Sequence, residues 1–298
     1  MRKLSIAFMA AVVMSSCSTT QNLDSGRMVN AGAAAVSAFM ITDAQIVSLC
    51  QQHMVESDKE NTILPASDSY STRLASVMSR FKNIGDLDVN YSVYQSSTVN
   101  AFASGDGSIR VYSGLMDVMT DDELFAVIGH ELGHVKNNDV RDAYRNAYLT
   151  VAAREGLAAI NSNMAWITDG LIGSVGQELA TSAYSRKQEY EADEAAFQFC
   201  VANGVDPYAM YNALQVLIRL SGNSGTSSKV AQMFSTHPDS EKRAKRIKEM
   251  AQALGATNNK ASSNSPSAQP TSKPSAKPKS TATPTSNSGS NKVSVKKP

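Results

Sequence analysis

Two histidines four residues apart constrain this chain more than any other feature, in the string His130-Glu131-Leu132-Gly133-His134. Residues four apart on a helix lie about 5 to 6 Å apart on one face, so both imidazoles can direct a ring nitrogen at one ion. Glu131 lies about 100° round the helix axis from His130, close enough to take a proton from a metal-bound water without being a ligand. The string therefore requires a helix and predicts a metal site on it.

The residues before this string predict the same helix independently. Thr120 and Glu123 have the spacing of a capping box, in which each side chain binds the backbone N–H of the other residue. Acidic residues in the first turn also suit the helix dipole. We expect the helix to continue to about Asn137 and to bury one apolar face, formed by Leu124, Val127, Ile128 and Leu132.

A catalytic zinc site usually has three protein ligands and a water, so two histidines leave it one ligand short. Glu189 and Asp193 are four residues apart in a second predicted helix, Glu178 to Ala202, which ends before Gly204. On one face of that helix, Glu189 can bind a metal while Asp193 accepts the ring N–H of a ligand histidine. From the pattern alone, acidic residues with this spacing usually belong to a solvated helix face.

The remaining pattern predicts an α+β fold that is mainly helical. Helices are expected at Thr42 to Glu56, Ser67 to Phe81, within Ala147 to Leu179, from Asp206-Pro207 to Leu220, and from Pro238 to about Leu254. Short strands are expected at Asp88 to Tyr94, Val99 to Ala103 and Ser108 to Tyr112, as a small antiparallel sheet. His53, on the first of these helices, is interpreted as structural.

The combined motifs resemble the HtpX, BepA and Oma-type zinc metallopeptidase family, most closely its LoiP-like group of outer-membrane lipoprotein proteases. The motifs are HExxH at 130–134, then Ser185-Arg186-x-x-Glu189-x-x-Ala192-Asp193, preceded by Asn100 to Ala103 and Ile109 to Met116, and followed by His237-Pro238 with Arg243. The resemblance covers roughly Ile41 to Leu254. It implies a zincin-like domain of the gluzincin type over residues 42–254, with the small sheet beside the HExxH helix.

The resemblance also implies a site and a reaction. One Zn²⁺ per chain would be held by His130, His134 and Glu189, with Glu131 as general base for peptide-bond hydrolysis and Asp193 as support for a ligand histidine. His237 is implied as a catalytic residue, either as a reversible fourth ligand that restrains activity or as a stabiliser of the tetrahedral oxyanion. A loop histidine that caps the last helix is the alternative for His237.

Four residues resemble the strand along which zincins bind substrate: Asn100, Ala101, Phe102 and Ala103. An exposed edge there pairs with an extended peptide backbone, which favours unfolded segments over compact domains. Phe102 is explained as well by a place in the core.

The N-terminus predicts export and a lipid anchor. Arg2 and Lys3 precede the apolar run Leu4 to Met14, which is too short to span a bilayer and is typical of a signal peptide. Small residues before Cys17 resemble a bacterial lipobox, although Met14 replaces the usual Leu. We expect residues 1–16 to be removed, Cys17 to be lipidated, and 17–41 to link a periplasmic domain to the outer membrane. An ordinary signal peptide with an incidental cysteine is the alternative.

The C-terminal residues 255–298 are rich in Ser, Thr, Pro and Lys and are expected to be disordered. Removing the seven tail lysines and two signal cations from 28 basic residues leaves 19 against 27 acidic ones, so the core carries about −8 and argues against a nucleic-acid partner. The basic tail is either a solvated spacer or a contact to an anionic cell wall or lipopolysaccharide.

Unfolded or misfolded envelope proteins are the expected substrates, which assigns the chain to protein quality control. Cleavage of peptidoglycan peptide crosslinks is a second hypothesis, and a binding lipoprotein whose zinc site is structural or latched is a third. In an oxidising compartment Cys50 and Cys200 are either a disulfide or two buried free thiols.

Overall fold

The computed structural model describes residues 41–82, 89–155 and 167–263. The predicted signal peptide, Cys17, nearly all of the linker and the tail beyond residue 263 lie outside these residues, as does the start of the first predicted strand. The chain divides into one compact unit up to Ala256 and a second unit from Thr257. Every predicted site residue from Asn100 onward belongs to the first unit.

The first unit is mainly helical, as predicted. Its helices are α2 (Asp43–Glu60), α3 (Ser69–Met78), α4 (Ser113–Val118), α5 (Asp121–Lys136), α6 (Asp139–Glu155), α7 (Asp169–Thr181), α8 (Arg186–Ala202), α9 (Ala209–Ser221), α10 (Ser227–Thr236) and α11 (Ser240–Ser263), the last of which continues beyond it. Its strands are β1 (Asn90–Tyr94), β2 (Ala101–Ala103) and β3 (Ser108–Tyr112). No helix in the described ranges is both long and apolar enough to cross a bilayer.

The sheet is mixed, which corrects the antiparallel prediction. β2 and β3 form the expected antiparallel hairpin, with Ala101 opposite Val111, around a turn in which Gly107 has φ 91°. β1 lies on the other edge of β3 and runs parallel to it, with Tyr91 opposite Ile109. After β1 the chain passes to the far edge of β3 before it forms β2. Alternation of apolar residues identifies strands but not their order, so the sequence could not reveal this crossing.

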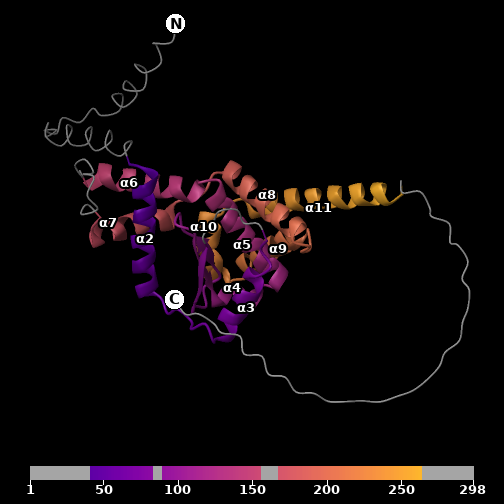
Figure 1. Cartoon of the computed structure of the whole chain (residues 1–298), viewed down its shortest axis with the longest axis horizontal. Coiled ribbons are helices and arrows are strands. Elements are labelled where there is room, and N and C mark those ends of the chain that lie inside the picture. The colour runs from indigo at the N-terminus through magenta and orange to yellow at the C-terminus, as the bar shows by residue number, and fades with distance from the viewer. Residues whose placement is uncertain (1–40, 83–88, 156–166, 264–298) are drawn as a thin grey trace, which may run out of the picture. The chain divides into compact units, whose positions relative to one another are not determined.

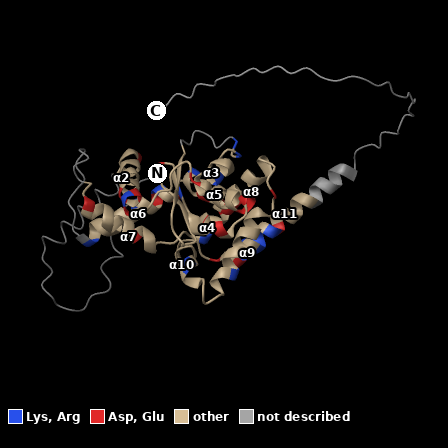
Figure 2. Cartoon of the chain, turned by 90° about the horizontal axis from the view of Figure 1, so that it is seen from below, with Lys and Arg blue, Asp and Glu red and all other residues tan. Residues whose placement is uncertain are grey.

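Two groups of helices surround the sheet (Figure 1). α2, α6 and α7 pack on one another, while α5 contacts α3, α8, α9 and β2 and forms the centre of the core. Contacts of α5 with α6 and of α10 with α7 join the groups. Exposed lysines, among them Lys242, Lys245 and Lys248, follow α11 on the outside (Figure 2).

A glycine brings α8 close to α5. A Cβ on Gly133 would lie 2.9 Å from the Cβ of Ala195 and 3.0 Å from the Cα of Ala192, so any larger residue would push the helices apart. This close approach places Glu189, in the first turn of α8, beside the two histidines of α5.

Several predicted boundaries are wrong. The single helix Glu178 to Ala202 is two helices, because α7 ends at Thr181 and a capping box between Ser185 and Gln188 starts α8. α11 continues to Ser263, well into the tail predicted to be disordered. α6 begins at Asp139, earlier than predicted, and α10 was not predicted.

The two cysteines remaining after Cys17 are free and buried, so of the two alternatives the structure has thiols and no disulfide between them. Burial raises the pKa of both Cys50 and Cys200 to about 12. His53 is partly buried and its Nδ1 lies 2.6 Å from the hydroxyl of Tyr144, a hydrogen bond that ties α2 to α6.

Candidate metal centre

Helix α5 positions His130 and His134 through local structure. The predicted capping box is present: the Thr120 hydroxyl accepts from the Glu123 N–H, and the Glu123 carboxylate accepts from the Thr120 N–H. Both histidines are buried, and the i, i+4 spacing places their Nε2 atoms 3.1 Å apart.

Two further donors come from distant parts of the chain. Glu189 lies in α8 and is fully buried, and His237 is the residue that ends α10. The His237 Nδ1 lies 3.0 Å from Glu189 Oε1 and 3.3 Å from the His130 Nε2. Glu189 also lies 3.4 Å from the His134 Nε2 and 3.6 Å from the His130 Nε2, each measured to the nearer carboxylate oxygen.

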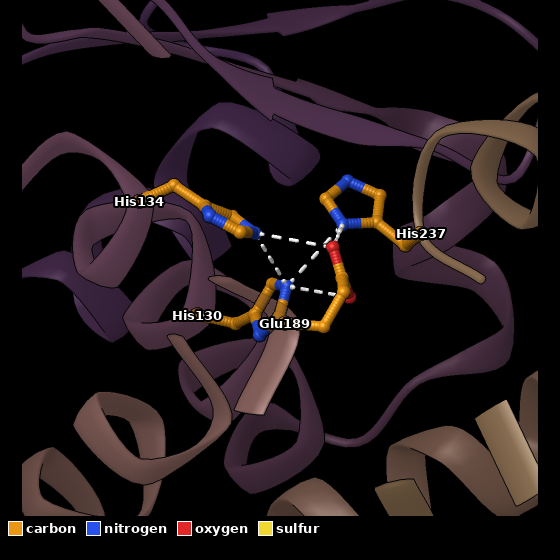
Figure 3. A group of neighbouring side chains, drawn as sticks. All are labelled: His130, His134, Glu189 and His237. Atoms are coloured by element: carbon orange, nitrogen blue, oxygen red, sulfur yellow. Dashed lines mark hydrogen bonds and ion pairs between the residues drawn. The ribbon is translucent and has the colours of Figure 1, made fainter. Parts of the chain in front are cut away.

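These four side chains point their donor atoms at a common centre (Figure 3). One donor atom from each of His130, His134, Glu189 and His237 lies within 4.8 Å of the others. Ligands about 2.0 to 2.1 Å from a tetrahedral zinc ion are about 3.3 Å apart, which is close to the separations found here. The spacing of the donors therefore suits a small tetrahedral cation.

Carboxylates orient the two α5 histidines from behind. The Nδ1 of His130 lies 3.0 Å from Asp193 Oδ1, and the Nδ1 of His134 lies 2.9 Å from Asp139 Oδ2. Because a carboxylate only accepts, each Nδ1 carries the proton and each neutral ring turns an unprotonated Nε2 to the centre. Two lone pairs 3.1 Å apart repel one another unless a cation lies between them, so the donor set fits a bound metal ion.

The electrostatics of the centre favour positive charge there. Burial lowers the pKa of His134, but hydrogen bonds to Asp139 and Glu189 outweigh it and raise that pKa to about 9. Burial alone would raise the pKa of Glu189, yet hydrogen bonds from His134 and His237 hold it well below its ordinary range. An ionised carboxylate thus faces the His134 ring, which holds a proton readily, and a bound metal ion would take the place of that proton.

Arg243 is a buried cation that joins two of these carboxylates. Its Nε and Nη2 donate to Asp193 over 2.9 and 2.7 Å, and its Nη1 contacts Glu189 Oε2. Burial would raise the pKa of Asp193, but the charge of Arg243 lowers it to about 2. Arg243 therefore keeps Asp193 ionised, and its guanidinium also contacts the ionised Glu189 in the buried part of the centre.

Glu131 is a buried acidic residue that lines a cavity beside the centre. It is 2 % exposed, and its Oε1 has no hydrogen-bond partner among the described residues. This Oε1 lies 3.7 Å from the His237 Nε2. Both side chains line this cavity of about 420 Å³, so the Glu131 side chain borders a space that can hold a water or a substrate.

The four residues predicted to bind substrate line the same cavity. Ala101 to Ala103 form β2, the strand at the end of the sheet order, and Asn100 precedes it. Phe102 is partly exposed and its ring lies near those of Tyr94 and Tyr112, so it belongs both to an aromatic cluster and to the cavity wall.

Two residues of the centre escaped the sequence analysis. Asp139 follows a turn in which Asn138 has φ 63°, and Gln188 of α8 donates to its second oxygen over 3.0 Å. Tyr184 stacks on the His134 ring, with centroids 3.9 Å apart and planes at 14°. The acidic residue just after the HExxH helix was a usable signal for Asp139, whereas nothing in the sequence marks Tyr184.

Comparison with known proteins gives a consistent result. The model of "Peptidase family M48" matches residues 65–251. Metalloprotease LoiP of Escherichia coli K12 is 37 % identical over 85 % of this chain and 98 % of its own length, and metalloprotease YcaL of the same organism is 33 % identical over 80 % and 93 %. A protease HtpX homolog of Sulfurihydrogenibium is 29 % identical over 52 % and 66 %. The predicted HtpX- and LoiP-type resemblance is thus confirmed.

The family model spans more than half of the chain, and it includes all four donors and Glu131. Two named relatives are aligned over nearly their whole length. A metal-dependent peptidase also accounts for the buried donor cluster and for the unpartnered acid beside it. This chain belongs to peptidase family M48 and is a metallopeptidase.

Proposed function

We propose that this chain is a zinc endopeptidase of the bacterial cell envelope that hydrolyses peptide bonds in unfolded or misfolded envelope proteins. The observation that carries the proposal is the position of Glu131, a buried and unpartnered carboxylate between a four-donor cluster and a cavity. Three imidazole nitrogens and one carboxylate are donors well suited to Zn²⁺.

The residues of the chain divide the reaction between them. When bound, zinc supplies a Lewis acid that acidifies a water and polarises the scissile carbonyl. Glu131 Oε1, free of other partners, takes the proton of that water and passes it to the leaving nitrogen. Asp193 and Asp139 keep the rings of His130 and His134 in one tautomer, so the reacting geometry does not have to be rebuilt at each turnover.

His237 completes a closed set of four donors in this conformation. A catalytic zinc site leaves one coordination position to water or substrate, so we infer that His237 withdraws when a substrate enters. Its Nε2 lies on the side of Glu131, where a withdrawn ring remains near the reacting atoms and can donate to the oxyanion.

Two features support extended substrates and an envelope location. β2 is an edge strand that lines the cavity, so it can pair with an extended peptide backbone. The N-terminal signal pattern predicts lipidation of Cys17 and a place on the periplasmic face of the outer membrane. A Cys17→Ser variant should then appear in the soluble periplasmic fraction, and its retention in the membrane would contradict the lipid anchor.

The decisive experiment compares proteolysis of denatured casein by the wild type and by Glu131→Gln, both loaded with zinc. Removal of the general base should lower the rate roughly 10²- to 10⁴-fold with the metal content unchanged. Glu191→Gln, an exposed acid in α8, is the matched control and should keep the wild-type rate. Equal rates for the wild type and Glu131→Gln would disprove the assignment.

The basic tail motivates a second candidate, cleavage of peptidoglycan crosslinks. Purified sacculi and denatured casein are incubated separately with the protein, and the released peptides are identified. Release from casein alone supports the proposal. Release from sacculi alone would contradict it and identify peptidoglycan crosslinks as the substrate.

A further inference from the structure

The cavity beside the metal centre is lined by acidic side chains and by no Lys or Arg of the described residues. The five carboxylates that line it are Glu60, Glu131, Asp139, Asp142 and Glu178. They come from α2, α5, α6 and α7, so the charge is spread along the cavity and is not confined to the metal centre. A cleft lined by one sign of charge focuses its potential and concentrates ligands of the opposite sign.

Helix ends add to this negative potential. The last turns of three helices line the cavity: α2 through Glu60, α7 through Glu178 and Leu179, and α10 through Thr236. A helix C-terminus carries a partial negative charge of about half an elementary charge. α6 and α8 begin at the cavity with the opposite sign, but the first turn of α6 carries Asp139 and Asp142, which offset it.

The carboxylates differ in how far other groups neutralise them. Asp139 binds His134, Asp142 lies 2.9 Å from Arg145, and Glu178 lies 3.6 Å from Arg154. Neither arginine lines the cavity. Each arginine offsets part of the charge of its carboxylate, and the longer Glu178–Arg154 separation leaves Glu178 less neutralised than Asp142.

Glu60 is the outer carboxylate without such a partner. It is exposed at the end of α2 and forms no ion pair with any described residue. The adjacent His53 adds no positive charge, because burial lowers its pKa. At the inner end, Glu131 lines the same space, and its buried Oε1 has no hydrogen-bond partner among the described residues.

We infer that this cleft selects extended peptide segments carrying Lys or Arg side chains close to the bond to be cut, and that Glu60 and Glu178 are the residues that attract them. The inference rests on the proposed peptidase function and adds a substrate class to it. Acidic segments meet repulsion from the same carboxylates, so the selection acts against them as well as for basic ones.

Binding tests the inference without relying on turnover. Three fluorescein-labelled unfolded peptides of one length carry Lys, Gln or Glu at the same alternate positions. Their affinity for zinc-loaded Glu131→Gln protein is measured by fluorescence anisotropy at low and high ionic strength. The Lys peptide should bind roughly tenfold more tightly than the Glu peptide at low salt, and salt should reduce this ratio.

Charge variants locate the effect. Glu60→Gln combined with Glu178→Gln should reduce the Lys-to-Glu affinity ratio by roughly threefold or more. The matched control combines Glu56→Gln with Glu191→Gln, which removes the same total charge from two residues that do not line the cavity. That control should keep the ratio within about twofold, and the thermal melts of both proteins verify that they are folded.

Three results of these binding measurements would contradict the inference. Equal affinity for the three peptides, tighter binding of the Glu peptide, or an equal loss of preference in both double variants would overturn the inference. If Glu131→Gln left casein proteolysis intact, the proposed function would fail, yet the binding preference would still be measured. If the inference and the proposed function both hold, the wild-type protein should cleave the Lys peptide with the highest kcat/KM, the Gln peptide with an intermediate value and the Glu peptide with the lowest.

Discussion

The histidines of α5 and the histidine at the end of α10 reach one cluster of donor atoms by different means. His130 and His134 are fixed by the i, i+4 spacing of one capped helix, and a carboxylate behind each ring holds its Nδ1. His237 lies between α10 and α11, with φ −122° and ψ 80°, and its backbone N–H donates to the Met233 carbonyl.

The rings also differ in their hydrogen bonds. The His237 Nδ1 faces Glu189, a member of the cluster itself, and its Nε2 lies 3.7 Å from Glu131, beyond hydrogen-bond distance. No described carboxylate outside the cluster holds this ring within that distance. A ring fixed from behind stays in place when the centre changes, whereas a ring held only through the centre can leave it. The α5 half is therefore the permanent part of the site, and His237 is the exchangeable part.

Removal of Arg243 should have the largest effect, because it attacks the permanent half. Arg243→Met leaves the buried Asp193 and Glu189 without their cation, which should cost about 3 to 5 kcal/mol of unfolding free energy. Urea unfolding of the metal-free protein measures this. Arg246→Met, in the same helix as Arg243, removes a partly exposed ion pair with Glu194 of α8 and should cost less than about 1 kcal/mol.

The same ion pair predicts an acid limit. The folded-state pKa of Asp193 is about 2 against an ordinary 3.8, so its contribution to stability is complete above about pH 4 and is lost as pH falls toward 2. In Arg243→Met this fall should flatten, because the cause of the low pKa is gone. A pH series of unfolding midpoints for the metal-free proteins checks it, and parallel acid profiles in both would contradict the assignment.

Asp139→Asn should have the next largest effect, on metal affinity. The amide can no longer fix the tautomer of His134 as a carboxylate does, and loss of such a partner typically lowers metal affinity about 10- to 100-fold. Competition with a zinc chelator measures the affinity. Asp142→Asn, one turn further along α6 and exposed, should bind zinc as the wild type does. Equal affinity in Asp139→Asn would mean that α5 alone orients the ring.

The permanent half is also the half that the sequence predicts best. Its features are local: a capping box between Thr120 and Glu123, and the spacing of His130 and His134. Residues close in the sequence form each of them, so the sequence alone predicts them. Glu189 required a family resemblance, because the distance between α5 and α8 depends on the close approach at Gly133.

Non-local features were missed for the same reason. The order of the strands depends on how the chain passes β3, which alternation does not encode. The break between α7 and α8 was encoded by Ser185 and Gln188, but the uninterrupted polar and apolar spacing around it suggested one helix. An acidic residue just after the HExxH helix was a usable signal for Asp139, but its partnership with His134 also requires a turn through Asn138 at positive φ, which the residue types do not specify.

His237→Ala should have the smallest effect, and its sign tells whether His237 restrains or assists the reaction. The three remaining donors keep a complete catalytic zinc set, so zinc affinity should fall less than in Asp139→Asn. If withdrawal of His237 limits access, casein proteolysis should rise roughly a fewfold, by the inverse of the fraction of time that the ring spends outside the cluster. A fall in kcat with unchanged zinc content would instead assign the ring to the oxyanion, because only a group that acts in the transition state lowers kcat without loosening the metal. Unchanged activity would show that the exchangeable half of the site does not control turnover.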